Sequence, residues 1–154
     1  MERPMDVRDS LLKAIDEVLD KMVFLFFEEN ESAFGGAKDF FFITQVEMSG
    51  VITGTMNIFL SEGTAALVAR NLLGIRDEDE LFEGTIDDAL EEFTNLIGGR
   101  MMTILHPPGP FNMEVPQRVD QPAQPAGGQS ELVINGTLED EPFKIRLAYR
   151  ETPT

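Results

Sequence analysis

The chain has 154 residues, a length typical of one domain, and its composition excludes several classes of protein. With 12 Lys and Arg against 28 Asp and Glu, the formal net charge is −16, so nucleic acids and anionic membrane surfaces are poor partners. The absence of Cys excludes disulfides and Cys-ligated metals, and the single His, His106, excludes a two-His metal site within one chain. Any chemistry must come from carboxylates, amides and hydroxyls, and we expect no metal site.

The start of the chain lacks the apolar segment of a signal peptide. The longest apolar run, residues 22–27, is far too short to span a bilayer. We therefore expect a cytoplasmic protein that does not enter membranes.

The first part of the chain predicts a helix followed by a β-hairpin. Apolar residues recur every three or four positions over 8–27, which is the spacing of one helix face, and residues 9–10 are candidate N-caps. Residues 40–46 and 51–60 are rich in aromatic and β-branched side chains, which favours two antiparallel strands that turn at 48–50.

Two further features follow from the same stretch. The continuous apolar run 40–43 indicates a strand covered on both sides, either in the core or at a subunit contact. Ser61 is the expected N-cap of a short helix over 65–73 that Gly74 ends, and an acidic connector follows at 76–83.

The longest predicted helix covers residues 86–105. Thr85 is its expected N-cap, with Asp88 at the third position of a capping box. The proline-rich segment 106–110 ends this helix, because proline lacks the N–H group that a helix needs.

The last part of the chain predicts strands around a loop. Residues 111–115 form a possible short strand, and residues 117–130, rich in Pro, Gln, Ala and Gly, predict a mobile loop. Strands are expected at 131–138 and 143–149, joined by a turn at 139–142. We therefore expect one α+β domain over the whole chain, in which an antiparallel sheet packs against two long helices.

Helix 86–105 has two opposite faces. One arc holds the apolar residues that we expect to face the core: Ile86, Leu90, Phe93, Ile97, Met101 and Ile104. The opposite side carries four residues at steps of four, three and four, which we call the ridge: Asp88, Glu92, Asn95 and Gly99. Leu96 and Met102 flank the ridge and are expected to leave apolar surface beside it.

The ridge alone fits an ordinary solvated helix face, with Asp88 as a cap and Glu92 as a surface carboxylate. The two adjacent glycines indicate that this face has an additional role, because Gly98 and Gly99 each cost about 1 kcal/mol relative to Ala in a helix interior. A close approach of another molecule to this face would compensate for that cost.

The ridge also carries a resemblance. Asp88, Glu92 and Asn95, continued by residues 96–99, resemble the D/S-x-x-x-E-x-x-N signature of the CheC/CheX/FliY phosphatases of bacterial chemotaxis. The single copy of this signature resembles CheX most.

Other segments agree with this resemblance. The Gly-spaced hairpin and following helix at 49–74, and the segment 111–116 with its proline, are similar to the corresponding parts of that family. The resemblance extends over most of the chain, from Leu11 to Tyr149.

The resemblance implies dephosphorylation of a phosphorylated CheY-like response regulator. It assigns Asn95 to place and polarise the attacking water and Glu92 to pair with the regulator's active-site lysine. Residues expected to support docking are Asp88, Leu96, Gly98, Gly99 and Met102. The chain would need no cofactor of its own, because the Mg²⁺ belongs to the regulator, and the resemblance also implies a homodimer.

General chemistry also supports the role of Asn95, independently of the family resemblance. Phosphoryl transfer needs a positioned water, and an amide both donates and accepts hydrogen bonds. The alternative is a non-catalytic adaptor that binds a response regulator or a flagellar-switch component. The intact pair of Glu92 and Asn95 favours the enzyme. A purely structural module would bind no phosphorylated receiver domain.

Overall fold

The computed structural model describes residues 6–30, 40–76, 79–107 and 109–153, so part of the expected acidic connector lies outside the described residues. In chain order the elements are α1 (Val7–Val18), the π-helical turn η1 (Leu19–Val23), β1 (Phe27–Glu29), β2 (Phe42–Ser49), β3 (Ile52–Leu60), α2 (Glu62–Leu73), α3 (Glu83–Leu105), β4 (Asn112–Met113), β5 (Gln117–Val119), β6 (Ser130–Leu138) and β7 (Glu141–Glu151).

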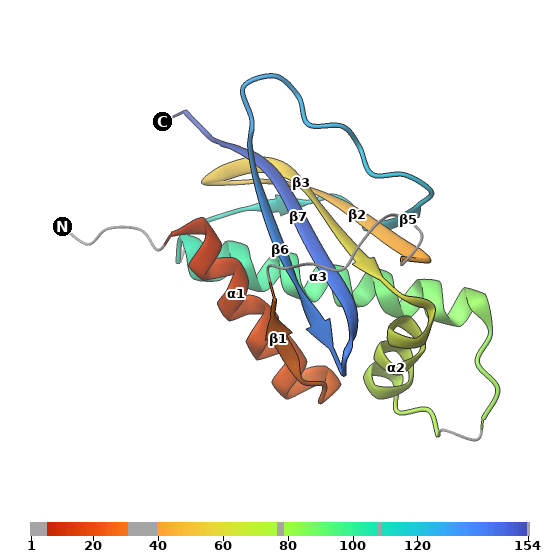
Figure 1. Ribbon diagram of the computed structural model, residues 1–154. Coiled ribbons are helices and arrows are strands. Elements are labelled where there is room, and N and C mark those ends of the chain that lie inside the picture. The colour runs from red at the N-terminus through yellow and green to blue at the C-terminus, as the bar shows by residue number, and fades with distance from the viewer. Residues whose placement is uncertain (1–5, 31–39, 77–78, 108, 154) are drawn as a thin grey trace.

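The strands form one antiparallel sheet in the order β1-β6-β7-β3-β2-β4, and β5 also pairs with β2. The helix α3 runs along the length of the sheet, with α1 beside its C-terminal half and α2 beside its N-terminal half (Figure 1). The expected α+β class is confirmed, with an antiparallel sheet and, in the described part of the chain, the two long helices and the shorter α2 that the sequence predicts.

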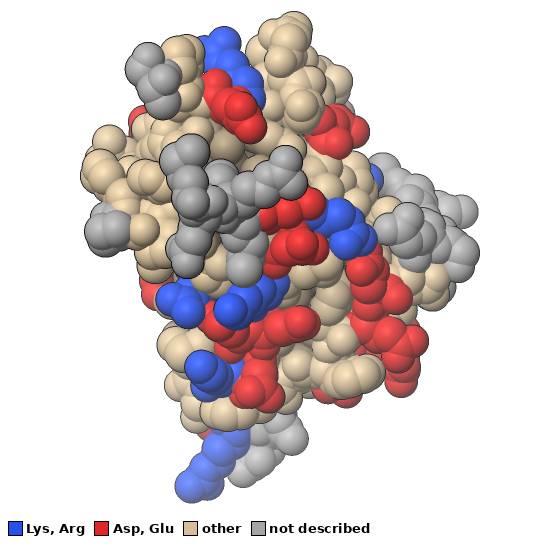
Figure 2. All heavy atoms as spheres, turned by 90° about the vertical axis from the view of Figure 1, so that its left-hand side faces the viewer, with Lys and Arg blue, Asp and Glu red and all other residues tan. Residues whose placement is uncertain are grey.

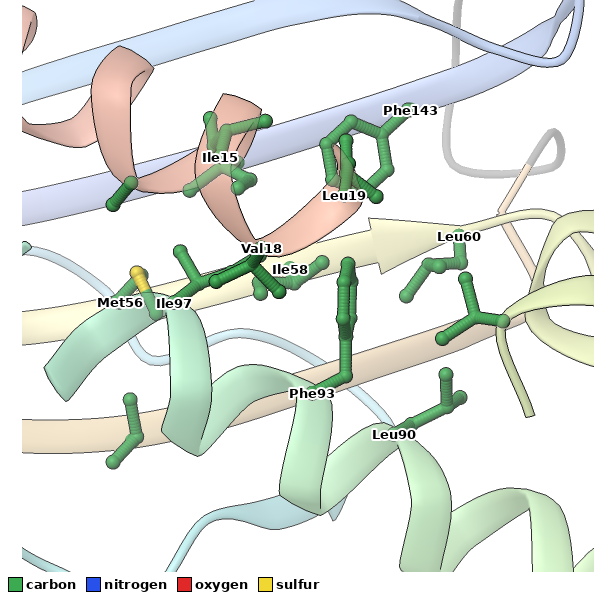
Figure 3. Packing of buried hydrophobic residues seen from close by; sticks show 14 of the residues in the cluster. Ile15, Val18, Leu19, Met56, Ile58, Leu60, Leu90, Phe93, Ile97 and Phe143 are labelled. Atoms are coloured by element: carbon green, nitrogen blue, oxygen red, sulfur yellow. The ribbon is translucent and has the colours of Figure 1, made fainter. Parts of the chain in front are cut away.

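The core lies between the helices and the sheet, and Figure 3 shows side chains from four elements and η1 meeting there. Its members include Ile15, Val18, Leu19, Met56, Ile58, Leu60, Leu90, Phe93, Ile97 and Phe143. Burying each such large side chain contributes about 1.5–3 kcal/mol. The apolar face expected for α3 is therefore confirmed, except that Ile104 is only partly buried and Leu105 takes the inner position.

The first helix differs from the expectation at both ends. The α1 helix begins at Val7 because Asp6 Oδ1 accepts a hydrogen bond from the Arg8 amide at 3.1 Å, whereas Ser10 is buried inside the helix. It does not continue to residue 27, because η1 follows and Phe24 then adopts a left-handed conformation with φ of 58°.

The long helix begins earlier than expected. The first helical residue of α3 is Glu83, and the N-cap is Phe82, whose side chain makes no capping hydrogen bond. Thr85 and Asp88 therefore lie inside the helix and form no capping box. The expected end at His106 is confirmed, as are the Ser61 N-cap and the end at Gly74 in α2.

Both hairpins have tight turns. In the first, Ser49 pairs with Thr53, so three residues, 50–52, form the turn, slightly later than expected. In the second, Glu139 and Asp140 have φ values of 50° and 69°, the conformation that tight two-residue hairpin turns need. As a result β7 begins earlier than expected.

The segment expected as an uninterrupted loop from 117 to 130 contains a strand. Its first residues form β5, which pairs with β2 at Ile43, Thr44 and Gln45. Further along, the Ala123 amide donates a hydrogen bond of 2.9 Å to Gln45 Oε1, which ties the segment to the sheet.

Candidate functional site

Two features of its inner side fix how α3 is rotated about its axis. Thr94 Oγ1 lies 2.6 Å from Thr44 Oγ1 of β2 and donates a hydrogen bond of 2.7 Å to the carbonyl oxygen of Leu90. Gly98 allows a close approach to the sheet, because a Cβ atom there would lie only 2.8 Å from Met113 Cε. The opposite side of α3 is thereby held toward solvent.

Ion pairs fasten the two ends of α3 to its neighbours. Arg118 of β5 contacts Glu83 Oε1 at 2.7 Å and Asp87 Oδ1 at 3.1 Å. At the other end, Arg100 pairs with Glu17 of α1, and its hydrogen bond holds the pKa of Glu17 below the ordinary value. Such exposed pairs are individually weak because water and salt screen them, but each joins α3 to a different neighbouring element.

The ridge faces outward, as predicted. Asp88, Glu92 and Asn95 are exposed, and Gly99 is partly exposed. Within the described residues, none of these three polar side chains forms a hydrogen bond or an ion pair. Asp87, by contrast, is paired with Arg118. The ridge therefore presents two carboxylates and one amide whose hydrogen-bonding capacity is available to a partner.

Two of the residues expected to support docking lie on the inner side of α3. Gly98 is buried against the sheet, and Met102 is only 2% exposed, with its Cε close to Gly50. The expectation that Met102 leaves apolar surface beside the ridge is therefore wrong, because α3 buries that side. Gly99 is different, since the nearest atom to a Cβ placed there is Met113 Sδ, at an ordinary contact distance of 3.7 Å.

Two hollows meet at Asn95. The first, which we call the acidic hollow, has a volume of ≈ 390 Å³ and lies between α3 and the segment 113–116. Its wall carries four carboxylates: Asp88, Glu91, Glu92 and Glu114. The second, which we call the α1–α3 groove, has a volume of ≈ 650 Å³ and is lined by Leu96, Gly99 and residues of α1 and η1. Asn95 lines both, so a partner that reaches this amide contacts both hollows.

Sequence reasoning missed two exposed apolar residues near Asn95. Val115, on the wall of the acidic hollow, is 76% exposed, and Met22, on the wall of the α1–α3 groove, is 44% exposed. The segment 111–116 was noticed only through its resemblance to a family. Nothing in the periodicity of the first helix distinguished Met22 from a core residue.

Within the described part of the chain, no group of three or more His, Asp or Glu side chains is arranged to hold a metal ion. None of the described helices has both the length and the apolar content to cross a bilayer.

The family model described as the chemotaxis phosphatase CheX matches residues 42–134, more than half of the chain. The chain belongs to the CheX family. The matched region contains the whole ridge and the β2–β3 hairpin. A comparison with the curated proteins finds no significant match.

Solved CheX structures share the fold of the chain. CheX from Desulfovibrio desulfuricans has a TM-score of 0.74 and 15% identity, with 95% of this chain and 100% of that chain covered. CheX from Vibrio vulnificus has a TM-score of 0.72 and 20% identity, covering 97% and 100%. A chain of the CheX–CheY–BeF3–Mg²⁺ complex from Borrelia burgdorferi has a TM-score of 0.69 and 22% identity, covering 95% and 99%.

Proposed function

We propose that this CheX-family chain hydrolyses the aspartyl phosphate of a phosphorylated CheY-like response regulator in the cytoplasm. Membership of a family of chemotaxis phosphatases supports this, as does the structure of a CheX relative in complex with CheY. The observation that carries the proposal is the ridge, where Glu92 and Asn95 are exposed on one side of an anchored helix without partners in the described chain.

Asn95 is the proposed water-positioning residue. Its amide oxygen accepts a hydrogen bond from the attacking water, while its N–H group donates to a phosphoryl oxygen. The water then attacks phosphorus, the bond from phosphorus to the aspartyl oxygen breaks, and the proton of the water passes to the phosphate. Holding the water in line supplies several kcal/mol of the rate enhancement without a strong base.

Glu92 is the proposed docking residue. It lies one helical turn before Asn95, about 4.5 Å along the axis, so both side chains reach the same partner. Its carboxylate would pair with the lysine of the regulator's phosphorylation pocket. In this proposal the Mg²⁺ is bound by the acidic residues of the regulator, and the chain itself has no cofactor.

The test is phosphate release from phosphorylated receiver domains, with and without the protein. Wild type should accelerate release, and Asn95→Ala should reduce the acceleration on the order of a hundredfold or more. Because Asn95 is exposed, this variant should melt no earlier than wild type and should still bind the regulator. Asn95→Gln should be partly impaired, since an extra methylene displaces the amide.

The matched control is Asn135→Ala, which removes an amide from β6 on the opposite side of the sheet and should leave turnover unchanged. Binding without any acceleration by the wild-type protein would establish the adaptor instead. Full turnover by Asn95→Ala would reject Asn95 as the water-positioning residue.

We also propose that the protein is a homodimer, with the apolar run 40–43 at the contact. Phe42 is buried in the core, whereas Phe41 is 55% exposed next to the partly exposed Phe40. An exposed aromatic side chain just before β2 is suited to a contact with a second copy of the chain.

A further inference from the structure

The α1–α3 groove is the larger of the two hollows that meet at Asn95, at ≈ 650 Å³ against ≈ 390 Å³. Its wall is apolar where Leu96, Phe111 and Met22 line it. Such an apolar wall beside the proposed reaction centre remains uncovered in the chain itself. A partner that places its phosphoryl group at Asn95 necessarily lies over part of this groove.

The wall formed by η1 is unusual in its backbone. Five residues, Leu19–Val23, form a π-helical turn, a conformation that is rare and frequently occurs at functional sites. The turn buries Leu19 and Val23 in the core, while Lys21 and Met22 between them line the groove. It therefore directs one cation and one apolar side chain toward the space beside Asn95.

The charges of the two hollows have opposite signs. Four carboxylates line the acidic hollow, whereas the α1–α3 groove is lined by two cations, Lys21 and Arg100, and one carboxylate, Glu17. Glu17 is already paired with Arg100, and Lys21 forms no ion pair within the described residues. The local charge thus changes from negative to positive across Asn95.

This positive charge is confined to a small area. The chain as a whole has a net charge of −16. On the side of the molecule shown in Figure 2, basic side chains lie among acidic ones and form no broad basic patch. A local cation next to an uncovered apolar wall is suited to one oriented contact rather than to general attraction of anions.

We infer that the α1–α3 groove is the second half of the docking surface and binds the acidic rim of the regulator's phosphorylation pocket, with Met22 against an apolar side chain of that rim. The inference rests on the proposed function. With the regulator's lysine on Glu92 in the acidic hollow, a carboxylate of the rim that is not a ligand of the Mg²⁺ faces Lys21, and this orientation pairs both charges.

The test is steady-state phosphate release by Lys21→Glu and Met22→Ser. Neither residue touches the reacting atoms, so kcat should stay at the wild-type value while KM rises, about tenfold for the charge reversal and a few-fold for the loss of apolar contact. Adding salt should reduce the effect of Lys21→Glu and leave that of Met22→Ser. Both side chains are exposed, and melting temperatures should be unchanged.

The matched control is Arg150→Glu, which makes the same change in net charge at an exposed position of β7, away from the groove. KM for this control should equal that of wild type. Equal KM values for wild type, Lys21→Glu and Met22→Ser would overturn the inference, as would an equal rise in KM for Arg150→Glu.

A failure of the proposed phosphatase activity can be distinguished from a failure of the docking inference. If wild type released no phosphate, the dissociation constants of the phosphorylated regulator would be measured by calorimetry for the same four proteins. Weaker binding of the two groove variants alone would still support the docking surface. Unchanged binding of both would reject it.

Discussion

The polar ridge residues Asp88, Glu92 and Asn95 have no hydrogen-bond or ion-pair partner inside the described chain, while two residues beside them do. Thr94 is fixed by Thr44 in the core, and Asp87 is fixed by Arg118 at the surface. Asn95, directly after Thr94, points to solvent without any such contact. The difference between adjacent residues follows from the helical step of about 100°, which puts one side chain in the core and the next outside.

Glu92 provides a test of binding at the residue scale. Glu92→Ala should weaken the association with the phosphorylated regulator because one ion pair is lost, and Glu92→Lys should weaken it further through repulsion between like charges. The dissociation constants of wild type and the two variants provide the measurement. Equal affinities for all three proteins would remove Glu92 from the docking surface.

The adjacent glycines should behave in opposite ways when they are replaced by leucine. Gly99→Leu meets only ordinary contacts and gains helix propensity, so thermal stability should rise by up to about 1 kcal/mol. Gly98→Leu forces a side chain against Met113 and Met48 and should destabilise the fold by about 1–3 kcal/mol.

Activity separates the same two variants. The leucine at residue 99 would lie on the wall of the α1–α3 groove next to Asn95 and obstruct the regulator, so phosphate release by the stable Gly99→Leu protein should fall. Denaturant unfolding and phosphate release on both variants provide the comparison. A fully active Gly99→Leu protein would mean that this glycine does not serve a close approach of the partner.

At the scale of the elements, the periodicity of apolar residues predicted α3 and its two faces, because burial dominates the energetics of a long amphipathic helix. The caps were less predictable. Thr85 has the right chemistry for an N-cap, yet the helix begins at Glu83, where Arg118 from a distant strand contacts its first turn. A contact between residues far apart in the chain leaves no local signal.

The same limit applies to η1 and β5. The pattern of apolar residues over 8–27 is compatible with a continuous α-helix, and the switch to a π-helical turn arises where the chain must reverse to pair β1 with β6. The composition of residues 117–130 indicates a loop, and β5 forms only because the edge of β2 is available to it. Both depend on tertiary contacts.

The pair of Glu17 and Arg100, which joins α1 to α3, predicts a dependence of stability on pH. Its hydrogen bond lowers the pKa of Glu17 from the ordinary value of 4.5, so the folded state releases the proton more readily than the unfolded chain. The contribution is therefore present above pH 4.5 and is lost as the pH falls through the lower folded-state value.

Glu17→Gln should accordingly melt slightly below wild type at neutral pH, and the difference should vanish in acid. Burial raises the pKa of the neighbouring Asp16 and acts in the opposite direction, but Asp16 is present in both proteins and cancels in the comparison. The check is the melting temperature of both proteins across this range of pH. A difference that persists unchanged in acid would mean that the ion pair does not stabilise the fold.

At the scale of the whole molecule, the order of elements and the two hairpins were predictable, because β2–β3 and β6–β7 are consecutive strands joined by short turns. The pairing of β3 with β7 and of β1 with β6 joins distant parts of the chain and was not predicted. The position of the Asn95 amide, at the junction of two hollows of opposite charge, could not be predicted from the sequence. That junction combines α3 with residues of α1, η1 and the segment after β4, and their meeting is a property of the fold alone.

The proposed homodimer gives the test at this scale. Phe41→Ser should shift the protein from dimer to monomer in sedimentation velocity experiments, because it removes an exposed aromatic side chain from the proposed contact. Phe82→Ser, at another exposed phenylalanine, should leave the sedimentation coefficient unchanged. A wild-type protein that sediments as a monomer at all concentrations would reject the dimer.

The ridge also has an evolutionary consequence. Because Asp88, Glu92 and Asn95 form no hydrogen bonds or ion pairs within the described fold, single codon changes there should abolish or redirect the proposed catalysis while the protein remains folded. A gene duplicate could therefore lose its activity and be retained as a binding protein, or acquire a new regulator, without first passing through an unstable intermediate.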